Sequence, residues 1–114
     1  MKRHIVQTTT FEKEIISLIA KRKLSAEDFE DFKKSLTENP EQGDVISGTG
    51  GIRKTRLKSI SKGKRGGFRV CYLNIEGKLI LFLLFIYPKN DQENLSQQEK
   101  IELKQIADAI KRSI

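Results

Sequence analysis

The residues best suited to chemistry lie in one basic stretch, residues 51–69, which reads GIRKTRLKSISKGKRGGFR. It contains eight Lys and Arg side chains and no acidic one. Residues 45–75 contain no Asp or Glu either. The other 14 cations of the chain (22 minus 8) are balanced by its 15 acids, so the net charge of +7 arises in this stretch. Chains tolerate such self-repulsion where something negative binds. The pattern predicts a docking surface for a polyphosphate.

Within this stretch, several cations are spaced for joint action on a phosphate. If residues 52–58 form a strand, Lys54, Arg56 and Lys58 share one face and Arg53 points to the other. An isolated lysine is a poor base, because its pKa is about 10.4, but neighbouring cations lower that pKa. If Arg69 on a paired strand joins this face, its guanidinium fork also matches phosphate oxygens. The trio of Lys54, Arg56 and Arg69 would combine a base with anion stabilisation.

Other kinds of site have little support. His4 is the single histidine, so a paired-histidine nuclease mechanism is excluded, and the single cysteine, Cys71, is interpreted as a packing residue. Zinc sites need several clustered Cys, His or acidic ligands, and none are clustered here. The glycines of SGTGG lack the lysine and serine of a nucleotide-binding loop. We therefore expect neither a zinc site nor a nucleotide-binding loop.

The sequence also indicates a compartment. A single cysteine allows no intramolecular disulfide, which suggests a reducing environment. The longest apolar run, residues 79–87, is too short to span a bilayer, and the N-terminus has no apolar stretch of signal-peptide length. We expect a cytoplasmic protein that does not contact a membrane.

Three helices are predicted, each from a capping signal followed by apolar residues at helical spacing. A Thr-x-x-Glu box at Thr9 predicts a helix over residues 10–22. Ser25 opens a second helix, which should stop before Pro40. Ser96 opens a third, which runs toward the C-terminus.

The strands that must carry the basic residues follow from a period of two. A first strand is predicted at residues 3–7 and three more at 52–58, 67–75 and 78–87, the last apolar on both faces and hence interior. Residues 41–51 are glycine-rich and should form an ordered turn region. The order βααβββα indicates an α+β fold, an antiparallel sheet with two N-terminal helices and a C-terminal helix packed on one face.

The segment NPEQGDVISGTGGIRKTRLKSISKGKRGGFRVCY, followed by IYPKND, resembles the HigB branch of the RelE-like toxins of bacterial type II toxin-antitoxin modules. The matching positions form a long, irregular run: Asn39, Pro40, Gly43, Asp44, Gly48, Gly50, Gly51, Arg53, Lys54, Gly63, Lys64, Arg65, Gly66, Gly67 and Arg69. The resemblance covers about residues 39–95 by motif and the whole chain by element order. It implies a single RelE-like toxin domain over residues 1–114.

The resemblance also implies an activity. Toxins of this kind are ribosome-dependent endoribonucleases that cut mRNA in the decoding site without metal or cofactor. The ribose 2′-hydroxyl attacks the neighbouring phosphorus and leaves a 2′,3′-cyclic phosphate. The implied partners are mRNA, the rRNA of the ribosome and a cognate HigA-like helix-turn-helix antitoxin, through which alone the chain would meet DNA.

For the site, the resemblance assigns Lys54 as general base and Arg56 and Arg69 as ligands of the phosphate and the transition state. Five further cations are predicted to bind RNA or the ribosome, three of them in the loop SKGKRGG: Arg53, Lys58, Lys62, Lys64 and Arg65. The alternative for that loop is a solvated hairpin tip, in which Lys and Gly are also ordinary.

The general acid is left open. In the better-known RelE pattern an arginine and a tyrosine follow the last strand, and a gapless match places Asn90 and Ser96 there instead. Lys89 is the first candidate for the acid and Tyr87 the second. The simpler interpretation of Tyr87 is that it ends a buried strand.

Two other functions compete with the nuclease. A non-catalytic RNA-binding or ribosome-associated protein would share the basic stretch but need only the charge of Lys54. A DNA-binding regulator would carry a helix-turn-helix, yet the predicted second helix is net acidic, which a DNA backbone would repel.

Overall fold

The computed structural model describes residues 3–59, 67–88 and 95–114. The elements follow the order β1 (His4–Gln7), α1 (Thr9–Ala20), α2 (Ala26–Glu38), β2 (Asp44–Val45), β3 (Arg53–Leu57), β4 (Phe68–Ile75), the 3-10 turn η2 (Glu76–Lys78), β5 (Ile80–Pro88) and α3 (Gln97–Ser113). This confirms the predicted α+β class and its three helices. Within these described stretches, no helix is long and apolar enough to cross a membrane.

The five strands form one sheet in the order β1-β5-β4-β3-β2. The hairpins β2–β3, β3–β4 and β4–β5 are antiparallel, and β5 lies inside the sheet, as its apolar character predicted. Two details differ from the prediction. The turn region contributes the two-residue strand β2, and β1 pairs with β5 in parallel. A period of two reports which residues share a face, but it does not report the direction of a partner distant in sequence.

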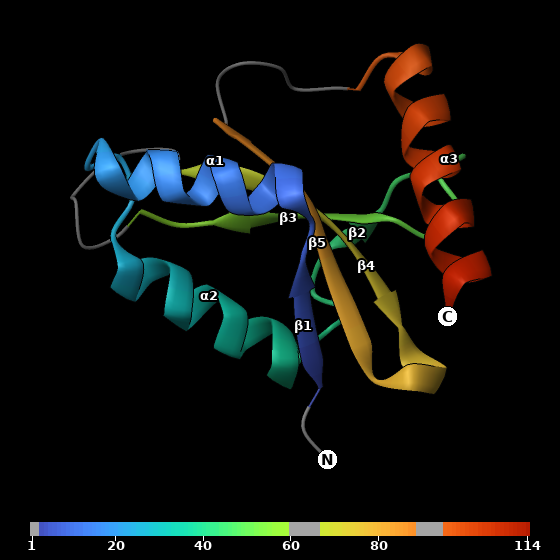
Figure 1. Ribbon diagram of the computed structural model, residues 1–114, viewed down its shortest axis with the longest axis horizontal. Helices are drawn as coiled ribbons and strands as arrows, with labels where there is room; N and C mark the ends of the chain where they lie inside the picture. The colour runs from blue at the N-terminus through green and yellow to red at the C-terminus, as the bar shows by residue number, and fades with distance from the viewer. Residues whose placement is uncertain (1–2, 60–66, 89–94) are drawn as a thin grey trace.

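Helices cover both faces of the sheet, so the prediction that all three pack on one face is wrong (Figure 1). One hydrophobic core joins α1 and α2 to the sheet and the second core joins α3 to the opposite face. The reason lies in β4 and β5, which bury apolar side chains in both directions and therefore require cover on both sides.

Side chains from the preceding residues cap all three helices. Ser25 accepts a hydrogen bond from the backbone of Asp28, and Ser96 forms a complete capping box with Glu99, both as predicted. The first helix instead begins one residue early, with Thr8 accepting from the backbone N–H of Phe11. A run of three threonines allows either register, because any of them can supply the capping oxygen.

A β-bulge between β4 and β5 reverses which side chains at the end of β5 point to each face of the sheet. Cys71 lies opposite Phe85 whereas Tyr72 lies opposite Leu83, which leaves Leu84 as the extra residue. Leu84 and Phe85 consequently both belong to the core beneath α3, together with Tyr87. Bulges occur next to active sites because they re-aim side chains.

The loop before β2 is tied to the middle of the sheet by a buried tyrosine. The Tyr72 hydroxyl donates to the carbonyl of Pro40 at 2.8 Å and accepts from the backbone N–H of Gly43 at 3.0 Å. A Cβ on Gly43 would lie 2.8 Å from the carbonyl oxygen of Lys54, so only glycine allows this approach. The loop thus packs directly against the backbone that carries Lys54.

Candidate functional site

The hydrogen-bond register brings three of the predicted catalytic cations onto one face of two adjacent strands. Arg56 of β3 is paired with Arg69 of β4, which in turn is paired with Tyr87 of β5. The next row on the same face consists of Lys54, Cys71 and Phe85. We call Lys54, Arg56 and Arg69 the cationic ladder. It lies on the face covered by α3, since Cys71 and Phe85 belong to the core beneath that helix.

Lys54 occupies a sheltered position in the ladder. Its side chain is half-buried, and it pairs in register with Asp44 of β2. It also lines a hollow of about 270 Å³ with Asp44, Leu95 and Lys100. A partly enclosed amine beside an opening has the geometry that a base acting on a bound nucleotide requires.

Arg56 also lines a second hollow, of about 290 Å³, between β3 and α2, although α2 covers the opposite face of the sheet, so Arg56 lies where the two faces meet at the edge of β3. Lys58 shares this hollow, as do Asp28 and Asp31 of α2. The two-residue strand β2 pairs with β3 at Arg53 and Lys54, which precede Arg56 in the chain. Arg56 is therefore the member of the ladder that shares a hollow with the acidic side chains of α2.

Arg53 points away from the ladder, as strand alternation predicted. Its guanidinium donates to the carbonyl of Gly43 at 2.7 Å and of Glu41 at 3.3 Å. The role of these contacts is to hold the loop that Tyr72 also anchors. Of the other predicted binding residues, Lys58 is exposed, while Lys62, Lys64, Arg65 and the acid candidate Lys89 lie outside the described residues.

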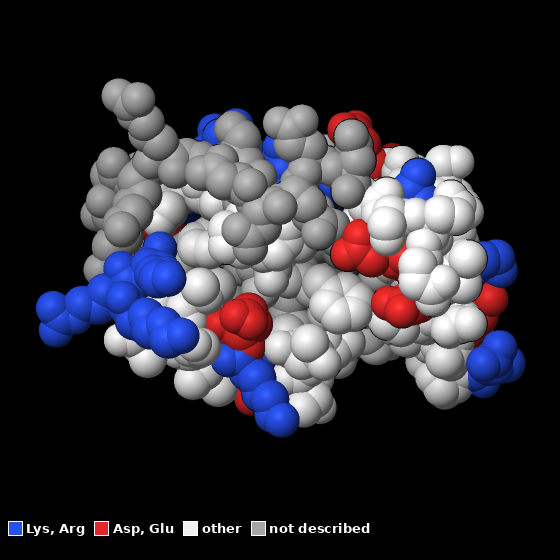
Figure 2. All heavy atoms as spheres, turned by 90° about the horizontal axis from the view of Figure 1, so that it is seen from above, with Lys and Arg blue, Asp and Glu red and all other residues white. Residues whose placement is uncertain are grey.

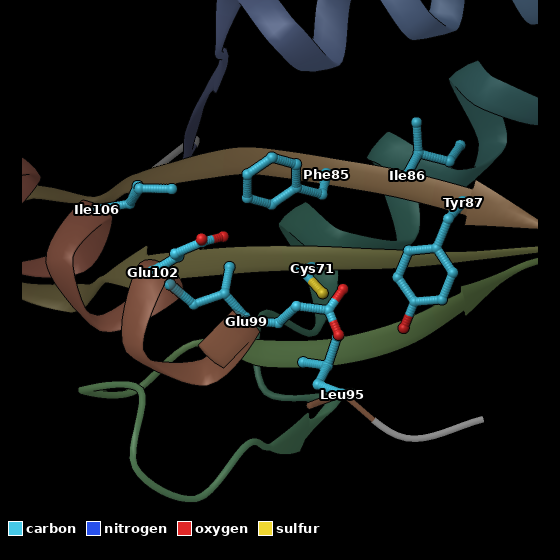
Figure 3. Close-up of a pocket in the computed structure, with 9 residues that line it drawn as sticks. Cys71, Phe85, Ile86, Tyr87, Leu95, Glu99, Glu102 and Ile106 are labelled. Carbon is cyan, nitrogen blue, oxygen red and sulfur yellow. The ribbon is translucent and has the colours of Figure 1, made fainter. Parts of the chain in front are cut away.

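Beside the ladder, a pocket of about 260 Å³ opens between the sheet and α3 (Figure 3). Cys71, Phe85 and Tyr87 line it from the sheet, and Glu99 and Glu102 line it from the helix. Neither acid was predicted as a site residue, because the predicted site followed the basic stretch. Their spacing of three residues, which places both on one face of a helix, was the available signal.

Burial dominates the electrostatics of the two titratable groups on the sheet side of this pocket. It raises the pKa of Tyr87 to about 12; the Arg69 charge acts in the opposite direction, and Glu99 adds to the rise. Burial also raises the pKa of the Cys71 thiol to about 11, against a smaller lowering by Lys54. Both groups therefore keep their protons at neutral pH. A protonated thiol is a poor nucleophile, which agrees with the packing role predicted for Cys71.

The buried thiol predicts a loss of stability in alkaline solution. The native pKa of Cys71, about 11, exceeds its ordinary value of 9.0, so its stabilising effect is complete below pH 9 and disappears as pH rises through 11. By pH 11 this group should cost the wild type roughly 2 kcal/mol of unfolding free energy. Urea unfolding at pH 8 and pH 11 measures the change, and Cys71→Ala should lose about that much less over the interval. An equal loss in both proteins would contradict the assignment.

A further group of cations extends the basic surface. Lys21, Arg22 and Lys23 form the exposed turn between α1 and α2, and the Ser59 hydroxyl donates to the carbonyl of Lys23 at 3.2 Å. The turn therefore lies beside the end of the segment that carries Lys58. In Figure 2, Lys and Arg side chains gather at this end of the molecule, while acidic side chains lie along the inner side of α3. Three consecutive cations between two helices were the signal in the sequence.

Comparison with known protein families gives a match over nearly the whole chain. The model described as the RelE toxin of the RelE / RelB toxin-antitoxin system matches residues 4–113. The matched region starts in β1, ends in α3 and includes the strands that carry the cationic ladder. The similarity thus covers the scaffold as well as the site.

Proposed function

Because the chain belongs to the RelE toxin family, we propose that it is a HigB-branch toxin of a type II module and cleaves mRNA on translating ribosomes in the cytoplasm. The observation that carries this proposal is the cationic ladder, in which one lysine and two arginines occupy neighbouring positions on a single sheet face. Cleavage by 2′-hydroxyl attack needs a base, positive charge at the phosphorane and a proton for the departing 5′-oxygen.

In this proposal Lys54 removes the proton from the ribose 2′-hydroxyl. Its half-buried amine borders a hollow into which a ribose can enter. Arg69 stands diagonally across from Lys54, one row further along the paired strand, and binds the non-bridging phosphate oxygens as charge develops on them. Arg56, paired with Arg69, provides the second cation.

The leaving 5′-oxygen has two candidate proton donors, Lys89 and Tyr87. Tyr87 has the support of position, because it lies in the same row as Arg69 and Arg56. Its hydroxyl also retains its proton at neutral pH, since burial raises its pKa to about 12. Lys89 follows β5 directly in sequence, one residue beyond Pro88.

Binding to the ribosome is assigned to the basic end of the molecule. Lys58 and the turn of Lys21, Arg22 and Lys23 are exposed there, and the loop with Lys62, Lys64 and Arg65 connects β3 to β4 in the chain. Contacts of this kind bind phosphate without reading sequence and weaken with salt. A HigA-like antitoxin, which would inhibit the toxin and carry the DNA-binding function, is the proposed protein partner.

The purified protein should cut mRNA at the decoding site of programmed ribosomes at low salt, and should leave the same mRNA intact without ribosomes. Primer extension locates the cuts, and a 2′,3′-cyclic phosphate on the upstream fragment identifies the reaction. Binding to ribosomes without any cleavage would instead favour the non-catalytic RNA-binding alternative. Expression should also arrest growth, and co-expression of an adjacent helix-turn-helix protein should relieve the arrest.

A further inference from the structure

The pocket between the sheet and α3 is separate from the cationic ladder but lies next to it. Its volume of about 260 Å³ lies just below the range typical of drug-sized ligands, roughly 300 to 1,000 Å³. The space therefore suits a single planar ring system. It opens beside Tyr87, whose partner in register is Arg69 of the ladder.

The sheet side of the pocket is suited to stacking. Phe85 and Tyr87 share one side of β5 by strand alternation, and the bulge at Leu84 turns that side toward α3. Cys71 and Leu95 add apolar surface to the pocket. In Figure 3 the Phe85 ring lies over β5, and the Tyr87 ring extends from β5 across the neighbouring strand. Stacking of a base on an aromatic side chain contributes about 1–3 kcal/mol.

The helix side of the pocket is acidic. In Figure 3 the Glu99 carboxylate reaches between Cys71 and Tyr87, and the Glu102 carboxylate lies between Phe85 and Ile106. Two carboxylates repel a phosphate, and as ionised groups they only accept hydrogen bonds. The part of the occupant that enters the pocket must therefore carry no negative charge and must present donors at its edge, as the edge of a nucleobase does.

Nucleobases differ in how well they meet this requirement. Guanine presents an imino N–H and an amino group side by side, which match the two oxygens of one carboxylate. Adenine and cytosine each present one amino group, and uracil presents a single imino N–H. Carboxylates read base donors in this way in protein–DNA complexes, where Glu and Asp accept from cytosine.

The charges around Tyr87 show how one nucleotide can span both compartments. Tyr87 lies within electrostatic range of both Arg69 and Glu99, which act on it in opposite directions. Because Tyr87 pairs in register with Arg69 and also lines the pocket, a nucleotide with its phosphate at the ladder can place its base in the pocket.

We propose that this pocket receives one unpaired base next to the scissile phosphate, and that Glu99 and Glu102 favour guanine over uracil there. The inference rests on the proposed function, since it names a specificity determinant of the same site. The region matched by the family, residues 4–113, includes the strands and the helix that line the pocket.

The test uses variants that remove the charge and keep the shape. Glu99→Gln preserves the helix cap, because Gln also serves at the third helical position of a capping box. Glu102→Gln replaces an exposed side chain of the same helix, so it should not disturb the fold. Glu14→Gln on α1, also exposed, is the matched control. Cleavage is measured on ribosomes programmed with mRNAs that carry each of the four bases in turn at every position of the decoding-site codon.

At one codon position the wild type and Glu14→Gln should cut guanine about tenfold or more faster than uracil, as expected for one good base contact. The doubly substituted protein should cut both within about threefold of each other, mainly through slower cutting at guanine. Unchanged preference in the double variant would overturn the proposal. A uniform gain or loss across all four bases would also overturn it, since that result indicates a general electrostatic effect.

A second measurement separates the pocket from the nuclease activity. Guanosine and uridine monophosphates are titrated into the protein without ribosomes, and NMR signals of the Phe85 and Tyr87 rings are followed. The guanine nucleotide should shift both rings in the wild type, and the shifts should be lost in the double variant. If the protein showed guanine-selective shifts but cut no mRNA, the proposed nuclease function would be refuted, whereas binding of guanine in the pocket would be supported. Cleavage without these shifts would refute the pocket alone.

Discussion

Replacing Lys54 with Arg is expected to lower the rate of mRNA cleavage on ribosomes by about 10² to 10⁴, the usual contribution of a general base. The substitution keeps the positive charge and nearly keeps the length of the side chain. An arginine, however, stays protonated at any pH that the protein experiences, with a pKa above about 12, so it cannot accept the 2′-hydroxyl proton. Single-turnover cleavage at saturating protein measures the change.

The control for this variant is Lys78→Arg in η2, at the exposed end of the β4–β5 connection and away from the ladder. It should cleave at the wild-type rate. Binding of the Lys54→Arg protein to ribosomes should remain within about threefold of the wild type, because phosphate contacts depend on charge. Full cleavage activity in Lys54→Arg would show that another group is the base, and lost binding would show that Lys54 acts mainly as a phosphate ligand.

The helices could be predicted from sequence because their signals are local. Ser25 and Ser96 cap the helices that follow them through hydrogen bonds to residues three positions later. The shared face of Lys54 and Arg56 could also be predicted, since it follows from alternation within one strand. The pairing of Arg56 with Arg69 needed one more step, the antiparallel hairpin, and the register provides it.

What the sequence could not supply depends on contacts between distant segments. Strict alternation along β5 would have put Phe85 on the side of Leu83, but the bulge places it with Leu84 and Tyr87. The direction of β1 and the side chosen by α3 likewise depend on partners far away in the chain. The bulge and the position of α3 together create the pocket, which explains why it was not predicted.

The two arginines on β3 show a similar limit. Both were predicted as functional on charge, yet the Arg53 guanidinium donates hydrogen bonds to two backbone carbonyls of the loop before β2. Those carbonyls are acceptors that no pattern of residue types reveals. Arg56 instead lines a hollow with Asp28 and Asp31 of α2. The charge pattern therefore identified β3 as the strand that carries the site, whereas only the contacts show that Arg53 and Arg56 have different surroundings.

Replacing Arg69 with Gln is the second change with a large expected effect, a loss of about 10² to 10³ in cleavage rate, comparable to the removal of one oxyanion-stabilising group. Arg69 is the central member of its row, between Arg56 and Tyr87, and its side chain is half-buried. A partly enclosed guanidinium is screened less by water than an exposed one, so its charge acts more strongly on the phosphorane.

The effect should fall on the chemical step more than on binding. Gln can still donate a hydrogen bond to a phosphate oxygen but cannot neutralise the extra charge that appears in the transition state. The cleavage rate at saturation should therefore fall by the full factor, while the concentration for half-saturation changes by less than about fivefold. Arg112→Gln, in the exposed last turn of α3, is the matched control and should leave both quantities unchanged. If Arg69→Gln instead raised only the half-saturating concentration, Arg69 would be a docking residue, and the transition-state charge would have to come from Arg56.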